Sequence, residues 1–375
     1  MGWNHDIERD LFQSIFRRSG HRFVVENATK PKRLERRSDG IGSKSDLVYT
    51  AKIIAQAFAD LQSELAHPSR GACAMHVNAT EPVRYVAPVY RPPSEASSLI
   101  LPVTDGCSWN RCTFCEMYTD PQKRFRPRSE EEVVATIRRC GETYGNSVRR
   151  VFLADGDAMT LSTRRLAKVL EAIRHEIPSV RRVSSYCLPR NLRKKSVAEL
   201  RELAELGLSL VYVGAESGDD EVLARVQKGE TFQSSRDSLE KLGDAGIKRS
   251  VMILNGLGGE ALSRQHARNS AALMNATQPE YLATLVVSFP KGEDRLLSNF
   301  PDFKPLDIVG LMREMEVLIS ELELKRTVFR SDHASNWLIL KGTLGADKAR
   351  LLDTLKHAIE APNEAGLRPA WARGL

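Results

Sequence analysis

SLILPVTDGCSWNRCTFC, residues 98–115, is the most informative stretch of this chain. Its first six residues are mostly apolar and predict a buried strand. The three cysteines that follow, Cys107, Cys112 and Cys115, have the spacing C-x4-C-x2-C on a loop that leaves the carboxyl end of that strand. Three thiolates on one short loop can bind three irons of a [4Fe-4S] cluster and leave the fourth iron open. An open iron is a place for chemistry, because a structural metal site normally has protein ligands at every position.

A zinc site is the alternative interpretation of the same cysteines. Zinc would need a fourth Cys or His ligand. The next cysteine, Cys140, lies in a pattern typical of a helix, and neither a second C-x2-C pair nor paired histidines follow. The spacing therefore favours an iron-sulfur cluster over zinc.

The alternation of apolar runs and helix-like periodicities after residue 97 indicates the fold. The six expected strands cover residues 98–103, 150–154, 182–188, 208–213, 249–254 and 281–287. The five expected helices between them cover residues 130–142, 163–176, 196–206, 234–245 and 263–276. This order predicts an α/β fold in which a parallel sheet curls into a partial (β/α)6, TIM-like barrel.

We expect the chain to have three parts. Residues 1–96 form an N-terminal extension that is partly helical and carries a basic stretch, residues 97–300 form the part-barrel, and residues 301–375 form a C-terminal helical segment. The helices expected outside the barrel cover residues 46–65, 306–323 and 346–359.

Five strings of the sequence together resemble the radical SAM superfamily. They are TDGCSWNRCTFCEMY (104–118), VFLADGDAM (151–159), VSSY (183–186), LVYVGAESGDDEVL (210–223) and FRSDHASN (329–336). Loops of this family usually read C-x3-C-x2-C with an aromatic residue before the last cysteine. Phe114 occupies that place here, and one extra residue separates the first two cysteines. The more specific resemblance is to the Elp3/coproporphyrinogen-oxidase-like branch.

The resemblance implies a shared first half-reaction. The open iron of the family's [4Fe-4S] cluster chelates S-adenosylmethionine (SAM), and an electron from a donor such as flavodoxin or ferredoxin cleaves SAM to methionine and a 5′-deoxyadenosyl radical. That radical abstracts hydrogen from a substrate. The resemblance thus implies an enzyme with two cofactors, whereas the substrate itself cannot be identified from the sequence.

The ends of the expected strands supply candidate cofactor-binding residues, because α/β barrels place their chemistry at the carboxyl ends of strands. Together with Phe114 in the cysteine loop, the candidates are Asp155, Gly156, Asp157, Ser185, Glu216, Ser217, Gly256 and Gly258.

Each of these positions has a possible role in SAM binding and a simpler structural explanation. The resemblance implies that Asp155 or Asp157 contacts the methionyl end of SAM, but both acids could instead complement the dipole of the next helix. A ribose hydroxyl pair is a plausible partner for Glu216, which would be costly to bury unpaired. The glycines after the fifth strand, Gly256 and Gly258, would let the backbone approach an adenine, or they could simply form a turn.

A polar string at residues 331–336 stands between two apolar runs. We expect it to fold back over the open mouth of the barrel, with Asp332, His333 and Asn336 as candidate catalytic residues, because radical chemistry needs water kept out. His333 is the member of the string that can exchange a proton near neutral pH. A turn capped by Asp332 and its neighbours is the alternative.

Charge and composition bear on partners and location. The formal net charge of +7 arises partly from a basic stretch at residues 17–37, which could bind RNA phosphates, although acidic residues interrupt it and a solvated arm is favoured. No run of apolar residues is long enough to span a membrane. The acidic N-terminus lacks a signal-peptide core, and a thiolate triad needs a reducing compartment, so we expect a cytoplasmic protein.

Two other functions remain open from the sequence. One is an RNA- or protein-modifying radical SAM enzyme that docks its target through the basic N-terminal arm. The other is a regulator that binds an iron-sulfur cluster or zinc without catalysis. Formation of 5′-deoxyadenosine separates an enzyme from a regulator.

Overall fold

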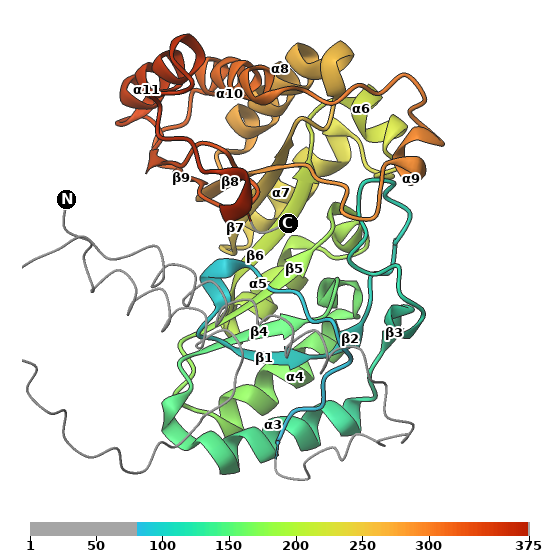
Figure 1. Ribbon diagram of the computed structural model, residues 1–375. Coiled ribbons are helices and arrows are strands. Elements are labelled where there is room, and N and C mark those ends of the chain that lie inside the picture. Colours follow the sequence, from blue (N-terminus) through green and yellow to red (C-terminus); the bar gives the residue numbers. More distant parts are fainter. Residues whose placement is uncertain (1–80, 374–375) are drawn as a thin grey trace, which may run out of the picture. The chain divides into compact units, whose positions relative to one another are not determined.

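An eight-stranded sheet lies at the centre of the computed structural model, which describes residues 81–373 (Figure 1). The strands, in their order across the sheet, are β1 (Leu99–Pro102), β4 (Arg150–Ala154), β5 (Arg182–Cys187), β6 (Leu208–Glu216), β7 (Lys248–Asn255), β8 (Tyr281–Val286), β9 (Val328–Ser331) and β10 (Leu340–Thr343). All neighbouring pairs are parallel except β9 and β10, which are antiparallel. The sheet has β1 and β10 as its two edges, so the expected α/β part-barrel is confirmed.

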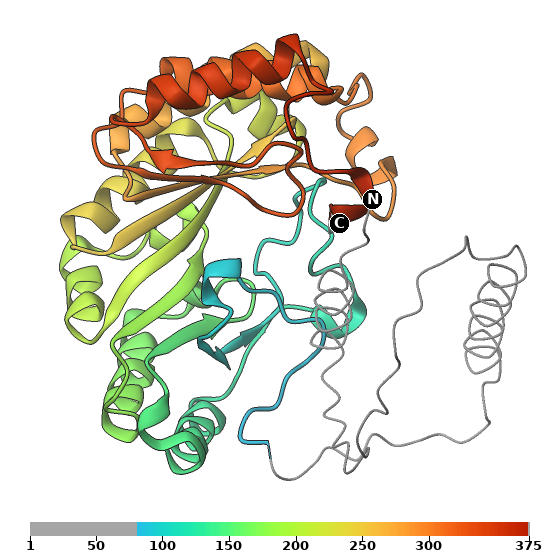
Figure 2. The ribbon, with the colours of Figure 1, turned by 60° about the vertical axis from the view of Figure 1, so that its left-hand side comes forward.

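Helices cover the outer face of this curved sheet (Figure 2). They are α3 (Glu130–Tyr144), α4 (Thr163–Glu176), α5 (Val197–Glu205), α7 (Phe232–Asp244), α8 (Gly259–Thr277), α10 (Ile308–Glu321) and α11 (Lys348–Glu360). The short helices α6 (Asp220–Arg225) and α9 (Asp294–Leu297) pack in a separate apolar cluster. A separate two-stranded sheet pairs β2 (Thr104–Asp105) with β3 (Arg126–Pro127). All these elements belong to one compact unit, Asn78–Leu375. The expected helix at 46–65 and the basic stretch at 17–37 lie outside the described residues.

Helix α4 illustrates why these segments fold as the sequence predicts. The side chain of Ser162 accepts a hydrogen bond from the amide of Arg165 and caps the first turn. Leu166, Leu170 and Ile173 recur at helical spacing and are almost completely buried. Each such side chain stabilises the fold by about 1.5–3 kcal/mol relative to exposure. The observed bounds of α4 are those expected.

The two faces of the sheet differ in composition. Aliphatic side chains point outward and join the main core with the helices. The inner face carries an aromatic cluster in which Phe152, Tyr186 and Tyr212 meet edge to face. Among residues 81–373, the two cysteines outside the cysteine loop, Cys140 and Cys187, are buried.

The C-terminal segment contains two strands that we did not expect. Helices α10 and α11 lie where the sequence predicts helices, but β9 and β10 between them extend the sheet beyond the part-barrel. Each strand has only four residues, which is too short for an alternating pattern to stand out. Among residues 81–373, no helix combines the length and the apolar character needed to cross a membrane.

Candidate active site

Three free cysteines project from the loop that follows β1 and β2. Cys107, Cys112 and Cys115 are all half-buried and form no disulfide. Burial raises the pKa of the Cys112 thiol to about 11 and also raises the pKa of the Cys107 and Cys115 thiols. The free thiols are therefore protonated at neutral pH, and binding of a metal must displace their protons.

The carboxylate of Asp157, beyond the end of β4, fixes the first part of the cysteine loop. It accepts a hydrogen bond from the amide of Ser108 at 3.2 Å, a second from the Ser108 hydroxyl, and a third from Asn191 Nδ2 at 3.3 Å. Burial raises the pKa of Asp157 to about 6, and these hydrogen bonds oppose that shift. In the structure, Asp157 thus anchors the residue next to Cys107.

Asp155 anchors the base of the same loop through a buried ion pair. Lys123 Nζ lies 2.5 Å from Asp155 Oδ2, and neither side chain reaches the solvent. The hydroxyl of Tyr118 donates to the other carboxylate oxygen at 3.4 Å. Gly156 separates Asp155 from Asp157 in the sequence. A Cβ added to Gly156 would lie 2.3 Å from the carbonyl oxygen of Gly106. The turn after β4 therefore packs directly on the start of the cysteine loop.

Glu216 and Lys228 form a second buried ion pair beside the cysteines. Glu216 is the last residue of β6, and its Oε1 lies 3.1 Å from Lys228 Nζ. Burial lowers the pKa of Lys228, but Glu216 and the Cys112 thiol outweigh that effect and raise it above the ordinary value. Glu216 Oε2 has no hydrogen-bond partner among residues 81–373, so it can accept one from a ligand.

The connection between β8 and α10 lies against the other side of the cysteine loop. The guanidinium of Arg295 donates to the carbonyl oxygens of Cys115 and, at 3.2 Å, of Asn110. Lys291 Nζ lies 3.3 Å from Asp120 Oδ1. The ring of Phe114 packs against an apolar cluster that includes residues of α9 and the turn after it. This connection therefore lies over the cysteine loop.

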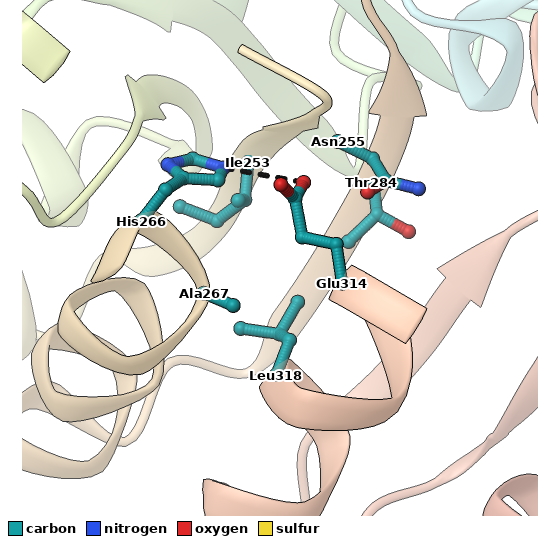
Figure 3. Close-up of a pocket in the computed structure, with 7 residues that line it drawn as sticks. All are labelled: Ile253, Asn255, His266, Ala267, Thr284, Glu314 and Leu318. Atoms are coloured by element: carbon teal, nitrogen blue, oxygen red, sulfur yellow. Dashed lines mark ion pairs between the residues drawn. The ribbon is translucent and has the colours of Figure 1, made fainter. Parts of the chain in front are cut away.

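A buried network behind the strand ends joins Ser217 to Gly256 through His266 and Glu314, and Figure 3 shows the ion pair between these last two. His266 Nδ1 lies 2.7 Å from Ser217 Oγ, and its Nε2 donates to the carbonyl of Leu254 at 3.0 Å. Glu314 Oε1 lies 3.8 Å from His266 Nε2 and accepts from the amide of Gly256 at 2.6 Å. Burial raises the pKa of Glu314.

Two acceptors of this network face one small cavity, which Figure 3 shows. Among the described residues, neither Asn255 Oδ1 nor Glu314 Oε2 has a hydrogen-bond partner, and both atoms are buried. Gly256 itself has a φ of +87°, which a residue with a side chain would rarely adopt. The glycine turn at the end of β7 is therefore held from behind by Glu314.

Ser185 and Gly258 contact other parts of the protein. The hydroxyl of Ser185 donates to the carbonyls of Leu153 and Tyr186. Gly258 precedes the first residue of α8, and a Cβ added there would lie 3.0 Å from the backbone of Leu262. Both residues lie at the carboxyl side of the sheet, as expected, and both are tightly packed.

The polar string at 331–336 lies at the carboxyl ends of β8 and β9. Asn336 is buried, accepts from the amide of Val286 at 2.9 Å and donates to the carbonyl of Thr284 at 2.8 Å. Asp332 pairs with Lys341 at 2.9 Å on a half-exposed site. Asn336 thus closes the end of β8 by side-chain hydrogen bonds.

His333 differs from its neighbours because one ring nitrogen is uncommitted. Nδ1 pairs with Ser335 Oγ at 2.9 Å, whereas Nε2 has no hydrogen-bond partner within residues 81–373. Burial and the nearby Arg368 lower the pKa of His333. Arg368 also donates to the carbonyl of His333, so the C-terminal segment fixes this turn.

The residues around the cysteine loop suit an iron-sulfur cluster. Three thiols share one loop, and Thr113 Oγ1 between them is buried without a hydrogen-bond partner in the described chain. A hydroxyl group of this kind can donate a hydrogen bond to a sulfur of the cluster. Within residues 81–373, no group of three or more His, Cys, Asp or Glu side chains converges to hold a single metal ion.

Several residues of this site were not singled out from the sequence. Lys228 precedes a glycine and could belong to a simple helix stop, and Lys123 and Arg295 carry no local signal. Lys228 and its partner Glu216 are twelve residues apart, and Arg295 lies 180 residues beyond Cys115. The buried position expected for Glu216 was the one available clue, because a buried carboxylate requires a partner.

Comparison with known proteins defines the class. The family model described as the radical SAM superfamily matches residues 101–268, which run from β1 into α8 and include all three cysteines. Residues 101–268 therefore match a radical SAM domain, and enzymes of that superfamily bind a [4Fe-4S] cluster and SAM.

One curated protein matches part of this chain at low identity. The heme chaperone HemW of Bacillus subtilis (strain 168) is 22% identical over 172 residues, which are 44% of this chain and 45% of HemW. The chain therefore spans less than half the length of this curated relative.

Solved structures with a similar fold include the coproporphyrinogen III oxidase HemN of Escherichia coli. It is 12% identical, with a TM-score of 0.46 over 60% of this chain and 52% of that one. The methyltransferase TsrM of Kitasatospora setae, solved with cobalamin and a [4Fe-4S] cluster, is 21% identical, with a TM-score of 0.41 over 50% of this chain and 36% of that one. At this level of similarity, neither structure carries an inference about chemistry.

Proposed function

We propose that this enzyme cleaves SAM reductively and uses the resulting radical to take a hydrogen atom from a substrate. The observation that carries the proposal is the arrangement of Cys107, Cys112 and Cys115 on one loop, with the Glu216–Lys228 ion pair beside it. When bound, the cluster and SAM supply a 5′-deoxyadenosyl radical. The tasks left to the protein are to bind, orient and shield them.

Lys228 contributes a buried positive charge next to the cysteines. Its ammonium group lies 5.9 Å from the centre of the Phe114 ring and influences the thiols of Cys112 and Cys107. Three thiolates bring negative charge into a site of low polarity, where a nearby cation is worth more than in water. Lys228 therefore favours the thiolate forms that bind metal.

Glu216 is proposed to face the ribose of SAM. Its Oε1 is committed to Lys228, and its free Oε2 can accept from a hydroxyl group. The turn at Asp155 to Asp157 lies against the start of the cysteine loop, which is the place proposed for the methionyl end of SAM. Gly256 and its neighbours on the same edge of the sheet are proposed to pass close to the adenine.

The 331–336 string and the β8–α10 connection are proposed to keep water from the reacting atoms. Arg295 attaches the connection to the cysteine loop, and Asn336 closes the end of β8. His333 is proposed to face the substrate through Nε2, as either a hydrogen-bond donor or a proton carrier. The substrate class is left open, and a cytoplasmic location, where thiols stay reduced, is part of the proposal.

Single replacements of the cysteines test this proposal. Cys107→Ala, Cys112→Ala and Cys115→Ala should each lose most of the iron after anaerobic reconstitution, together with the response of the cluster spectrum to SAM. Cys140→Ala, a buried cysteine in α3, is the matched control and should keep both. If any loop variant retains a full, SAM-responsive [4Fe-4S] spectrum, the ligand assignment is wrong.

A further inference from the structure

The outer surface of the cysteine loop carries a group of cationic side chains around one indole. Arg190 lies over the Trp109 ring, with its guanidinium carbon 3.5 Å from the ring centre, and Arg111 lies 5.2 Å from the same centre. We call Trp109, Arg111, Arg190, Arg193 and Lys194 the basic patch. Arg111, Arg193 and Lys194 are exposed.

A buried acid, Glu230, lies beneath two arginines of the patch. Arg190 Nε lies 2.8 Å from Glu230 Oε1, and Arg193 Nη2 lies 3.3 Å from Glu230 Oε2. The side chain of Glu230 is 1% exposed, so it holds the two arginines from beneath. Two of the four cations thus share one covered carboxylate, whereas Arg111 and Lys194 form no ion pair among residues 81–373, so the surface that a partner meets is positive.

The patch is part of the structure that holds the cysteines. Trp109 lies between Cys107 and Cys112 in the loop, and its Nε1 donates to the carbonyl of Gln227 at 2.9 Å. A Cβ added to Gly229 would lie 2.3 Å from the indole, so only glycine lets the ring approach this closely. Gly229 follows Lys228 directly. The basic patch therefore covers the segment whose buried lysine points toward the cysteines.

We propose that the basic patch is the docking surface for an acidic, one-electron carrier protein that reduces the cluster. This inference rests on the proposed function, since SAM cleavage consumes one electron per turnover. The reduced carrier loses one electron and the oxidised cluster gains it, and the transfer itself neither forms nor breaks a covalent bond. Docking on the cysteine loop gives a short path for the electron, and opposite charges raise the rate of encounter.

RNA is the other polyanion that such a surface could bind. Base stacking on Trp109 would require displacement of Arg190, which already lies on the ring at 3.5 Å. Sequence-tolerant binding of single strands normally depends on free aromatic faces. The patch is thus better suited to carboxylates on a folded protein than to exposed bases.

The test uses the full chain with its reconstituted cluster and a photoreduced flavodoxin as the acidic donor. Charge reversal by Arg193→Glu and Lys194→Glu, singly and together, should slow cluster reduction by the donor, by about tenfold or more in the double variant at low salt. Lys194 is exposed and its side chain forms no hydrogen bond or ion pair within residues 81–373, so its replacement removes no polar contact. Lys356→Glu, on the exposed side of α11, is the matched control and should keep the parental rate.

Photoreduced 5-deazariboflavin, a small uncharged reductant, separates the docking proposal from the proposed function. All variants should be reduced by it at the parental rate. The docking proposal is overturned if the double variant accepts electrons from flavodoxin as fast as the parent, or if the parental rate does not fall with added salt. It is also overturned if the parent is reduced by deazariboflavin but not by flavodoxin, or if the variants lose only RNA binding. A parent that holds no cluster after reconstitution refutes the proposed function itself, and the docking proposal with it.

Discussion

Lys228 Nζ lies 3.1 Å from Glu216 Oε1, and the two side chains are only 4% and 11% exposed. The pair closes a loop of the chain that begins at the end of β6 and passes through α6. Gly214 makes room for it, since a Cβ there would lie 2.2 Å from the carboxylate of Glu216. One buried cation and one buried carboxylate thus stand together beside the cysteines.

Removal of one member of this pair should cost more than removal of both. Lys228→Met leaves a buried carboxylate without a partner and should lower the free energy of unfolding by about 3–5 kcal/mol. The double variant Lys228→Met, Glu216→Gln should recover much of that loss, because it strands no charge. Urea unfolding of the metal-free protein measures both. Additive losses in the double variant would show that the two residues are not energetically coupled.

Glu314 should make stability depend on pH. Burial raises its pKa in the folded protein above the value of about 4.3 expected in the unfolded chain. Its contribution to stability is therefore fully present below that unfolded value and is lost as the pH rises through the folded pKa.

The variant Glu314→Gln keeps an acceptor for the amide of Gly256 and cannot ionise. The free energy of unfolding of the variant should rise progressively relative to that of the parent as the pH increases from about 4 to about 8. Chemical denaturation across this range checks the trend. A stability difference between the two proteins that stays constant with pH would contradict the assignment of a raised pKa to Glu314.

Asn336 and His333 should respond differently to replacement by alanine. Asn336→Ala strands the carbonyl of Thr284 and leaves the amide of Val286 with Ser335 Oγ as its acceptor, and should lower the free energy of unfolding by about 1–3 kcal/mol. His333→Ala removes a half-buried ring with one free nitrogen and should cost less than about 1 kcal/mol. His333→Ala should lower the rate of SAM cleavage and, once a substrate is known, the rate of its turnover. If His333→Ala has normal kinetics in both, the string is only a capped turn.

Arg295 should keep the β8–α10 connection closed over the cysteine loop. Arg295→Met removes hydrogen bonds to the carbonyls of Cys115 and Asn110 but keeps much of the apolar stem. The reconstituted variant should release iron to a chelator severalfold faster than the parent. Arg268→Met is a fitting control, because Arg268 pairs with Glu321 at a half-exposed site on α8. If Arg295→Met and Arg268→Met release iron at the same rate, the β8–α10 connection does not protect the cluster.

The sequence reveals the barrel better than it reveals the contacts within it. Strand β4 and helix α4 have the bounds expected, because apolar periodicity and the Ser162 cap are local signals. The ion pairs Lys123–Asp155 and Lys228–Glu216 depend on how distant turns meet, which periodicity does not record. The roles proposed for Glu216, His333 and the glycines in binding SAM or substrate remain predictions.

Formation of 5′-deoxyadenosine tests the central claim most directly. The reconstituted protein is incubated anaerobically with SAM and a low-potential reductant, and the nucleoside is quantified by chromatography. The account predicts time-dependent formation of 5′-deoxyadenosine together with methionine by the parent and by Cys140→Ala, and no formation above background by the triple variant Cys107→Ala, Cys112→Ala, Cys115→Ala. A parent with a full [4Fe-4S] cluster that binds SAM but yields no 5′-deoxyadenosine under reduction would contradict it.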